Sequence, residues 1–123
     1  MDIDEYLKGV LGQILNSYKI LVELNSDPND LDIIKKETAK INGLLQVIHN
    51  KLDAKKYQSD HLVTLRKLST HYIDTYDYSR EIEYLAKIYD EDANRIKNLR
   101  VLIINSLNDK MMIEKFQTII DEL

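Results

Sequence analysis

Glycine and proline are rare in this 123-residue chain, and their positions constrain its fold more than any other feature. The chain contains only Gly9, Gly12, Pro28 and Gly43, so residues 44–123 hold neither residue type. A β-sandwich or a doubly wound sheet of this length needs several glycine turns, many of them at positive φ. The sequence therefore predicts an all-α protein, in which we expect the three glycines to mark places where a neighbouring helix approaches closely.

The composition is that of a folded domain. Apolar residues make up 44% of the chain and charged residues 31%, which is enough apolar material for a core, and the length is usual for one domain. The chain has no cysteine, which excludes a disulfide scaffold, a thiolate metal site and a cysteine nucleophile. We expect a single helical-bundle domain spanning residues 1–123.

Apolar residues recur at steps of three and four along most of the chain, the period of an amphipathic helix. The pattern predicts an antiparallel bundle of four long helices followed by a short C-terminal helix. Asp2 is placed to cap the first helix and Asp27 the second, with Pro28 in the first turn, where its missing N–H does no harm. Asn108 and Asp109 are placed to cap the last helix.

The boundary between the third and fourth helices depends on residues 74–77, whose short polar side chains favour caps over helix interiors. Without glycine or proline there, the two helices can also be continuous, and a fused rod needs a second copy to cover its apolar stripe. The fourth helix is expected to run from Tyr78 to Ile103. Asp92 then falls at an apolar position and needs a polar partner, for which Arg95 is poorly directed.

One segment has the spacing of a catalytic motif. The stretch Arg66-Lys-Leu-Ser-Thr-His71 resembles the Arg-x4-His motif of the HEPN ribonucleases and toxins, which are small all-helical proteins. The resemblance implies that Arg66 would neutralise phosphate charge and that His71 would act in acid–base chemistry. Lys67 stands where that family usually has a small polar residue. The alternative is a surface arginine and a histidine near a helix end.

The chain contains no other sequence motif for metal binding, phosphate binding or nucleophilic catalysis. There is no Glu-x-x-His, no His-Glu-x-x-His, no glycine-rich phosphate loop and no nucleophile elbow. We therefore expect no metal and no cofactor.

Charge and hydropathy bear on partners and compartment. The formal net charge is −4, and without a basic face we do not expect nucleic-acid binding. The longest apolar run is Val101–Ile104, too short to span a bilayer. The first residues are acidic, unlike the basic start of a secretory signal. We expect a cytoplasmic protein that does not enter the membrane.

Tyrosine is concentrated in one region. Five of the eight tyrosines fall between positions 72 and 89, and tyrosine is enriched at binding surfaces. Tyr78 and Tyr89 fit the apolar stripe and are expected in the core, whereas Tyr72, Tyr76 and Tyr84 are candidates for contact with a partner. The alternative is that all of them line the wet edge of the core.

The first helix carries a second apolar row, which widens its apolar face and suggests contact with a partner; its members are Leu11, Leu15, Tyr18 and Val22. The rhythm of Leu44–Leu52 and Glu81–Leu107 is similar to that of the flagellar and type III export chaperones, which hold an apolar helix of their cargo in a groove. The leading interpretation is a non-enzymatic helical module, such as an adaptor, an inhibitor or an export chaperone, that binds a partner protein or forms a homodimer.

Overall fold

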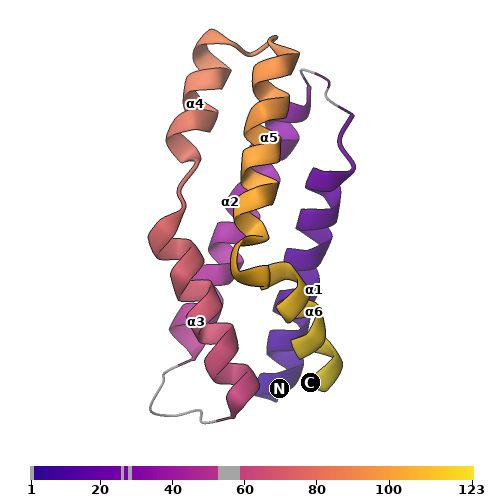
Figure 1. The fold of residues 1–123 in the computed structure, drawn as a ribbon, viewed down its shortest axis with the longest axis vertical. Helices are drawn as coiled ribbons and strands as arrows, with labels where there is room; N and C mark the ends of the chain where they lie inside the picture. The colour runs from indigo at the N-terminus through magenta and orange to yellow at the C-terminus, as the bar shows by residue number, and fades with distance from the viewer. Residues whose placement is uncertain (1, 26, 28, 53–58) are drawn as a thin grey trace.

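The computed structural model describes residues 2–25, 27, 29–52 and 59–123. This part of the chain is all-α, with six α-helices, one 3₁₀ turn and no strand. No helix within it is long and apolar enough to cross a membrane. The helices are α1 (Ile3–Val22), α2 (Asp30–Lys51), α3 (Asp60–Thr75), α4 (Ser79–Ile88), α5 (Ala93–Leu107) and α6 (Met112–Glu122), with the 3₁₀ turn Asp109–Met111 between the last two (Figure 1).

The helices α1 and α2 are the longest, with 20 and 22 residues, or about 30 Å each. They pack antiparallel to one another, and α3 returns antiparallel along α2 (Figure 1). Beyond α3 the chain continues into α4, which packs against both α2 and α5, while α5 and α6 follow each other along α1. The bundle therefore has two unbroken legs, α1 and α2, and two legs that are each broken into a pair of helices.

A side-chain cap begins α1, as predicted: the Asp2 side chain accepts a hydrogen bond from a backbone N–H of the first turn. The prediction that Asp27 caps the second helix is wrong, because the N-cap of α2 is Asn29, whose side chain makes no capping hydrogen bond. Asp27 Oδ1 accepts from the Asn29 N–H at 2.9 Å, and Asp30 Oδ2 accepts from the Asp27 N–H at 3.0 Å, so these bonds hold the turn before α2. Pro28, predicted in the first turn, lies outside the described residues.

The predicted break at residues 74–77 is confirmed. The helix α3 ends at Thr75 and α4 begins at Ser79, so the two helices are not fused. Asp77 Oδ1 accepts from the Ser79 hydroxyl at 2.7 Å and from the Ser79 N–H at 3.0 Å. These two bonds hold the pKa of the Asp77 carboxyl below its usual value, because they favour the charged form.

The prediction of one continuous helix from Tyr78 to Ile103 is wrong. The chain breaks between Ile88 and Ala93, and Asp92 is the N-cap of α5. Its Oδ1 accepts from the Arg95 N–H at 3.1 Å and its Oδ2 lies 3.2 Å from Arg95 Nε. The carboxylate therefore begins α5 instead of being buried in the stripe, and Arg95, expected to be poorly directed, is its partner. The fourth of the predicted long helices is thus two shorter helices, α4 and α5.

The predicted short C-terminal helix is present as α6, but the chain enters it in an unexpected way. In the preceding 3₁₀ turn, Lys110 has φ 55° and Met111 has φ 58°. Left-handed backbone costs a residue with a side chain about 1–2 kcal/mol, and no glycine occurs there to signal it. This turn lets α6 fold back along α1 and α3.

The interpretation of the glycines as packing positions is wrong. A Cβ built on Gly9, Gly12 or Gly43 meets no heavy atom within 4 Å. All three are exposed on helix surfaces, so no neighbouring helix approaches them closely. The glycines stand beside apolar residues in the sequence, but in the structure they face solvent.

The core draws on all six helices, and four polar residues of α1 and α2 are also buried, among them Asp30 at the start of α2. Ser17 is fully buried, Glu37 and Thr38 are each 4% exposed, and the Ser17 hydroxyl donates to Glu37 Oε1 at 2.9 Å. The largest fully buried apolar side chains are Leu7, Leu11, Ile14, Leu21, Ile34, Ile41, Leu45, Ile48, Leu52, Leu65, Tyr72 and Phe116.

Candidate functional site

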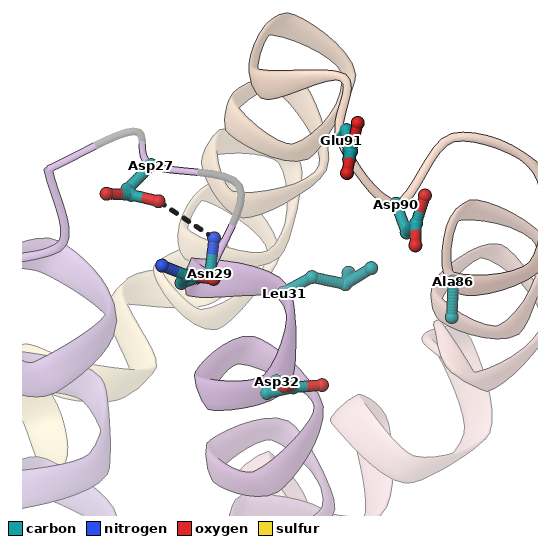
Figure 2. Close-up of a pocket in the computed structure, with 7 residues that line it drawn as sticks. All are labelled: Asp27, Asn29, Leu31, Asp32, Ala86, Asp90 and Glu91. Atoms are coloured by element: carbon teal, nitrogen blue, oxygen red, sulfur yellow. Dashed lines mark hydrogen bonds between the residues drawn. The ribbon is translucent and has the colours of Figure 1, made fainter.

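One end of the molecule carries an acidic hollow of about 610 Å³ between the start of α2 and the connection from α4 to α5 (Figure 2). Figure 2 shows the Asp32 side chain extending from α2 toward α4, with Asp90 and Glu91 on the opposite connection. Among the residues that the structure describes, no three His, Asp or Glu side chains are grouped so as to hold a metal ion. The hollow is lined by Asp27, Asn29, Leu31, Asp32, Ala86, Asp90 and Glu91.

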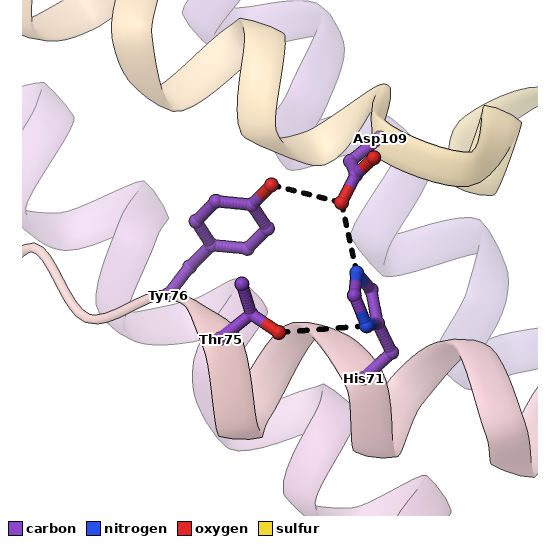
Figure 3. A network of polar contacts seen from close by, with 4 residues as sticks. All are labelled: His71, Thr75, Tyr76 and Asp109. Atoms are coloured by element: carbon purple, nitrogen blue, oxygen red, sulfur yellow. Dashed lines mark hydrogen bonds and ion pairs between the residues drawn. The ribbon is translucent and has the colours of Figure 1, made fainter.

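The two residues of the ribonuclease-like motif, Arg66 and His71, both lie within α3. Five residues of an α-helix turn through about 500°, so the two side chains leave the helix about 140° apart. His71 is bound elsewhere, because its Nε2 lies 2.8 Å from Asp109 Oδ2 (Figure 3). Within one chain the two side chains therefore do not lie on the same face of α3, from which both could contact one phosphate.

Asp109 is the centre of a polar network that the sequence did not reveal (Figure 3). Its Oδ2 also accepts from the Tyr76 hydroxyl at 2.8 Å, and the Thr75 hydroxyl lies 3.4 Å from His71 Nδ1. The hydrogen bonds from His71 and then Tyr76 hold the pKa of Asp109 below its usual value, and the bond to Asp109 raises the pKa of Tyr76. The network joins the break between α3 and α4 to the turn between α5 and α6.

Three of the six residues predicted to contact a partner are used within the chain. Leu11 is fully buried and Tyr72 is 2% exposed, and burial raises the pKa of Tyr72 to about 12. Tyr76 is half-buried, with its ring centroid 5.2 Å from that of Tyr72. Tyr78, predicted in the core, is buried, whereas Tyr89 is half-buried.

Of the other three residues predicted to contact a partner, two are half-buried and one is exposed. Leu15 and Tyr18 are half-buried, and the Tyr18 hydroxyl accepts from Asn108 Nδ2 at 2.8 Å. Their helix, α1, packs against α5 and α6 of the same chain, and Val22, the last residue of the row, is 45% exposed. Tyr84 is 51% exposed and lies beside a hollow on the surface.

This hollow, which we call the α4–α5 groove, has a volume of about 500 Å³. Leu85 and Leu99 belong to the core and form its apolar base. Of the ten residues of α4, the structure buries Ile82 and Leu85, so most of this helix remains available. The residues that line the groove are Arg80, Glu81, Tyr84, Leu85, Arg95, Asn98 and Leu99.

Further apolar side chains continue the two walls. Ile88 follows Tyr84 by one turn of α4 and is 58% exposed, and Leu102 follows Asn98 by one turn of α5 and is 52% exposed. Arg95 supplies positive charge on the α5 side and is held in place, because its guanidinium carbon lies 3.9 Å from the centroid of the Tyr89 ring.

No protein-family model, no curated protein and no solved structure matches this chain. Its function is therefore argued from the structure itself.

Proposed function

We propose that the protein is a non-enzymatic interaction module that holds an amphipathic helix of a partner protein in the α4–α5 groove. The observation that carries this proposal is Tyr84, half-exposed at the edge of an apolar hollow whose base is formed by core leucines. Large apolar side chains left beside a concave surface are typical of protein-binding sites. Amphipathic helices bind in such grooves through anchors at steps of three and four residues.

The geometry of the groove favours a helix as the occupant. Its walls are two helices, and the exposed apolar residues on them, Tyr84 with Ile88 and Leu102 on the other side, are spaced along both walls. A third helix laid between α4 and α5 can bury Tyr84 and Ile88 on one side and Leu102 on the other.

The charges at the groove favour acidic residues on the partner. Arg80 lies at the start of α4 and Arg95 at the start of α5, and because the two helices run in opposite directions these cations flank opposite ends of the groove. Glu81 is the one carboxylate among the lining residues, and Asp92, outside that lining, lies 3.2 Å from Arg95 Nε and offsets part of its charge. We propose a partner helix with an apolar face and a carboxylate toward each end.

A homodimer is the weaker form of this proposal. Its support is the wide apolar face of α1, which α5 and α6 contact and on which Val22 is 45% exposed. The groove agrees with the function implied by the resemblance to export chaperones, although the chain between Glu81 and Leu107 forms two helices and not one.

The test is selection of partners from a displayed library of peptides, with the purified protein as bait. We expect the selected peptides to be amphipathic helices with acidic residues near their ends. They should bind at least tenfold more weakly to a Tyr84→Ala/Ile88→Ala variant. The Met111→Ala variant is the matched control, because Met111 is 55% exposed but lies far along the chain in the turn before α6.

Two results contradict the proposal. One is a library that yields no helical binder. The other is a set of binders that the groove variant retains as well as the control does. Self-association that Tyr84→Ala abolishes in sedimentation would assign the groove to a second copy instead.

The ribonuclease alternative has its own test. We expect that the purified protein does not cleave RNA through these two residues. Any cleavage that is measured should therefore be the same in the Arg66→Ala and His71→Ala variants. Cleavage that both substitutions abolish, in folded variants, would replace the interaction module with an enzyme.

A further inference from the structure

The other side of α4 also has a groove, along its junction with α2. The acidic hollow of Figure 2 lies at one end of this junction, and a smaller hollow of about 160 Å³ lies further along it. The residues that α2 and α4 contribute follow helical steps of three and four, so the two hollows are in line. From α2 these are Asp32, Lys35, Ala39 and Asn42, and from α4 and its end they are Ser79, Glu83, Ala86 and Asp90.

Negative charge dominates this α2–α4 groove. Five carboxylates line its two hollows, against the single ammonium group of Lys35. Carboxylates gathered along a concave surface raise the local concentration of cations. The carboxylates are Asp27, Asp32, Glu83, Asp90 and Glu91.

A buried hydroxyl group without a partner lies at the inner end. Thr38 lines the smaller hollow and is 4% exposed, and among the residues that the structure describes its Oγ1 finds no hydrogen-bond partner. Buried polar atoms in proteins are nearly always hydrogen-bonded, so an exception requires an explanation. A donor that enters the hollow would satisfy this oxygen.

We propose that the α2–α4 groove binds an alkylammonium chain, and that the ligand is a free linear polyamine. The ammonium groups of such a molecule would donate to the carboxylates of the outer hollow and to Thr38 Oγ1 in the inner one. The methylene groups between them would contact the apolar residues of the same hollows, Leu31, Ala86 and Ile82. A volume of about 160 Å³ admits a narrow chain but not a helix, which distinguishes this site from the α4–α5 groove.

The experiment measures binding of spermidine to the full chain by calorimetry at low ionic strength. We expect Asp32→Asn/Asp90→Asn to raise the Kd about tenfold, because each removed ion pair at the surface contributes modestly. The control is Glu114→Gln/Asp121→Asn, which removes the same two charges from exposed positions on α6 and should leave the Kd within twofold of the parent.

Thr38 gives a second and independent readout. Thr38→Val keeps the shape of the side chain but removes the hydroxyl, so we expect the variant to unfold at a higher temperature than the parent and yet to bind spermidine about fivefold more weakly. Thr38→Ser keeps the hydroxyl and should bind as the parent does.

Several results would overturn the proposal. These are the absence of spermidine binding, equal weakening in the α6 control, and a Thr38→Val variant that is stabilised but binds normally. A trilysine peptide that binds while spermidine does not would show that the ammonium groups come from lysines of a partner protein.

Discussion

The hydrogen bond between Ser17 and Glu37 places a carboxyl group inside the junction of α1 with α2. Ser17 is fully buried, Glu37 is 4% exposed, and the two oxygens are 2.9 Å apart. Within the described part of the chain, the Ser17 hydroxyl is the side-chain group that donates a hydrogen bond to the Glu37 carboxyl. Ser17→Ala removes it and should lower the free energy of unfolding by about 1–3 kcal/mol, because a buried polar group is left without its partner.

The double variant Ser17→Ala/Glu37→Met should behave differently. Methionine has nearly the shape of glutamate, and once both polar groups are gone no desolvated carboxyl remains. We expect its stability to equal or exceed that of the parent, although each position has lost a hydrogen-bonding group. The coupling free energy between the two positions should therefore be at least about 1 kcal/mol.

Urea denaturation followed by far-UV circular dichroism measures these differences. Thermal unfolding is a second measurement, in which a difference of 1 kcal/mol in the free energy of unfolding corresponds to roughly 3–6 °C in Tm for a chain of this size. Ser69→Ala is a matched control, since Ser69 is also fully buried but its hydroxyl has no hydrogen-bond partner among the described residues, so its loss should not lower the stability. A Ser17→Ala variant within about 0.3 kcal/mol of the parent, or a double variant equal to the sum of the single ones, would refute the reasoning.

Further predictions concern the glycines, Asp109 and the core. Gly9→Ala, Gly12→Ala and Gly43→Ala should each stabilise the fold by about 0.5–1 kcal/mol in urea denaturation, because the added methyl group meets open space; a loss of stability would show a close contact. The lowered pKa of Asp109 means that its stabilising effect is complete above the ordinary carboxyl pKa of about 3.9 and is lost as the pH falls through the lower folded value. Asp109→Asn should therefore flatten the acid side of the profile of Tm against pH, and an unchanged acid limb would contradict this. Leu45→Asp should unfold the bundle by placing a charge at a fully buried position, and a Tm within a few degrees of the parent would contradict that assignment.

Local signals in the sequence account for the parts of the fold that were predicted correctly. Asp2, Asp27 and Asp77 each accept from an amide two residues further on, so these local turns follow from nearby sequence alone. The break between α4 and α5 has the same kind of cap, Asp92, but the apolar period continues across it. A helical pattern cannot distinguish one helix from two whose apolar faces share the same phase.

The parts that were missed depend on contacts between distant segments. Leu11 was expected to contact a partner but is buried in a core to which α5 and α6 contribute, and no glycine in the sequence signals the left-handed turn at Lys110. Glu37 is charged and would be assigned to the surface by its type. Tyr84 was correctly placed off the apolar stripe, but the groove beside it exists only through the packing of α4 on α5.

The two broken legs of the bundle are interrupted at the same level, and this has a mechanical consequence. Tyr76, at the end of α3, is joined to Asp109, after α5, by a hydrogen bond of 2.8 Å, so the hairpin of α4 and α5 leaves the bundle and returns to it at one point (Figures 1 and 3). A segment anchored in this way can tilt as a unit about its anchor without stretching either connection. The α2–α4 groove lies between this hairpin and α2, so such a rotation would change its width, whereas both walls of the α4–α5 groove belong to the hairpin and would keep their separation.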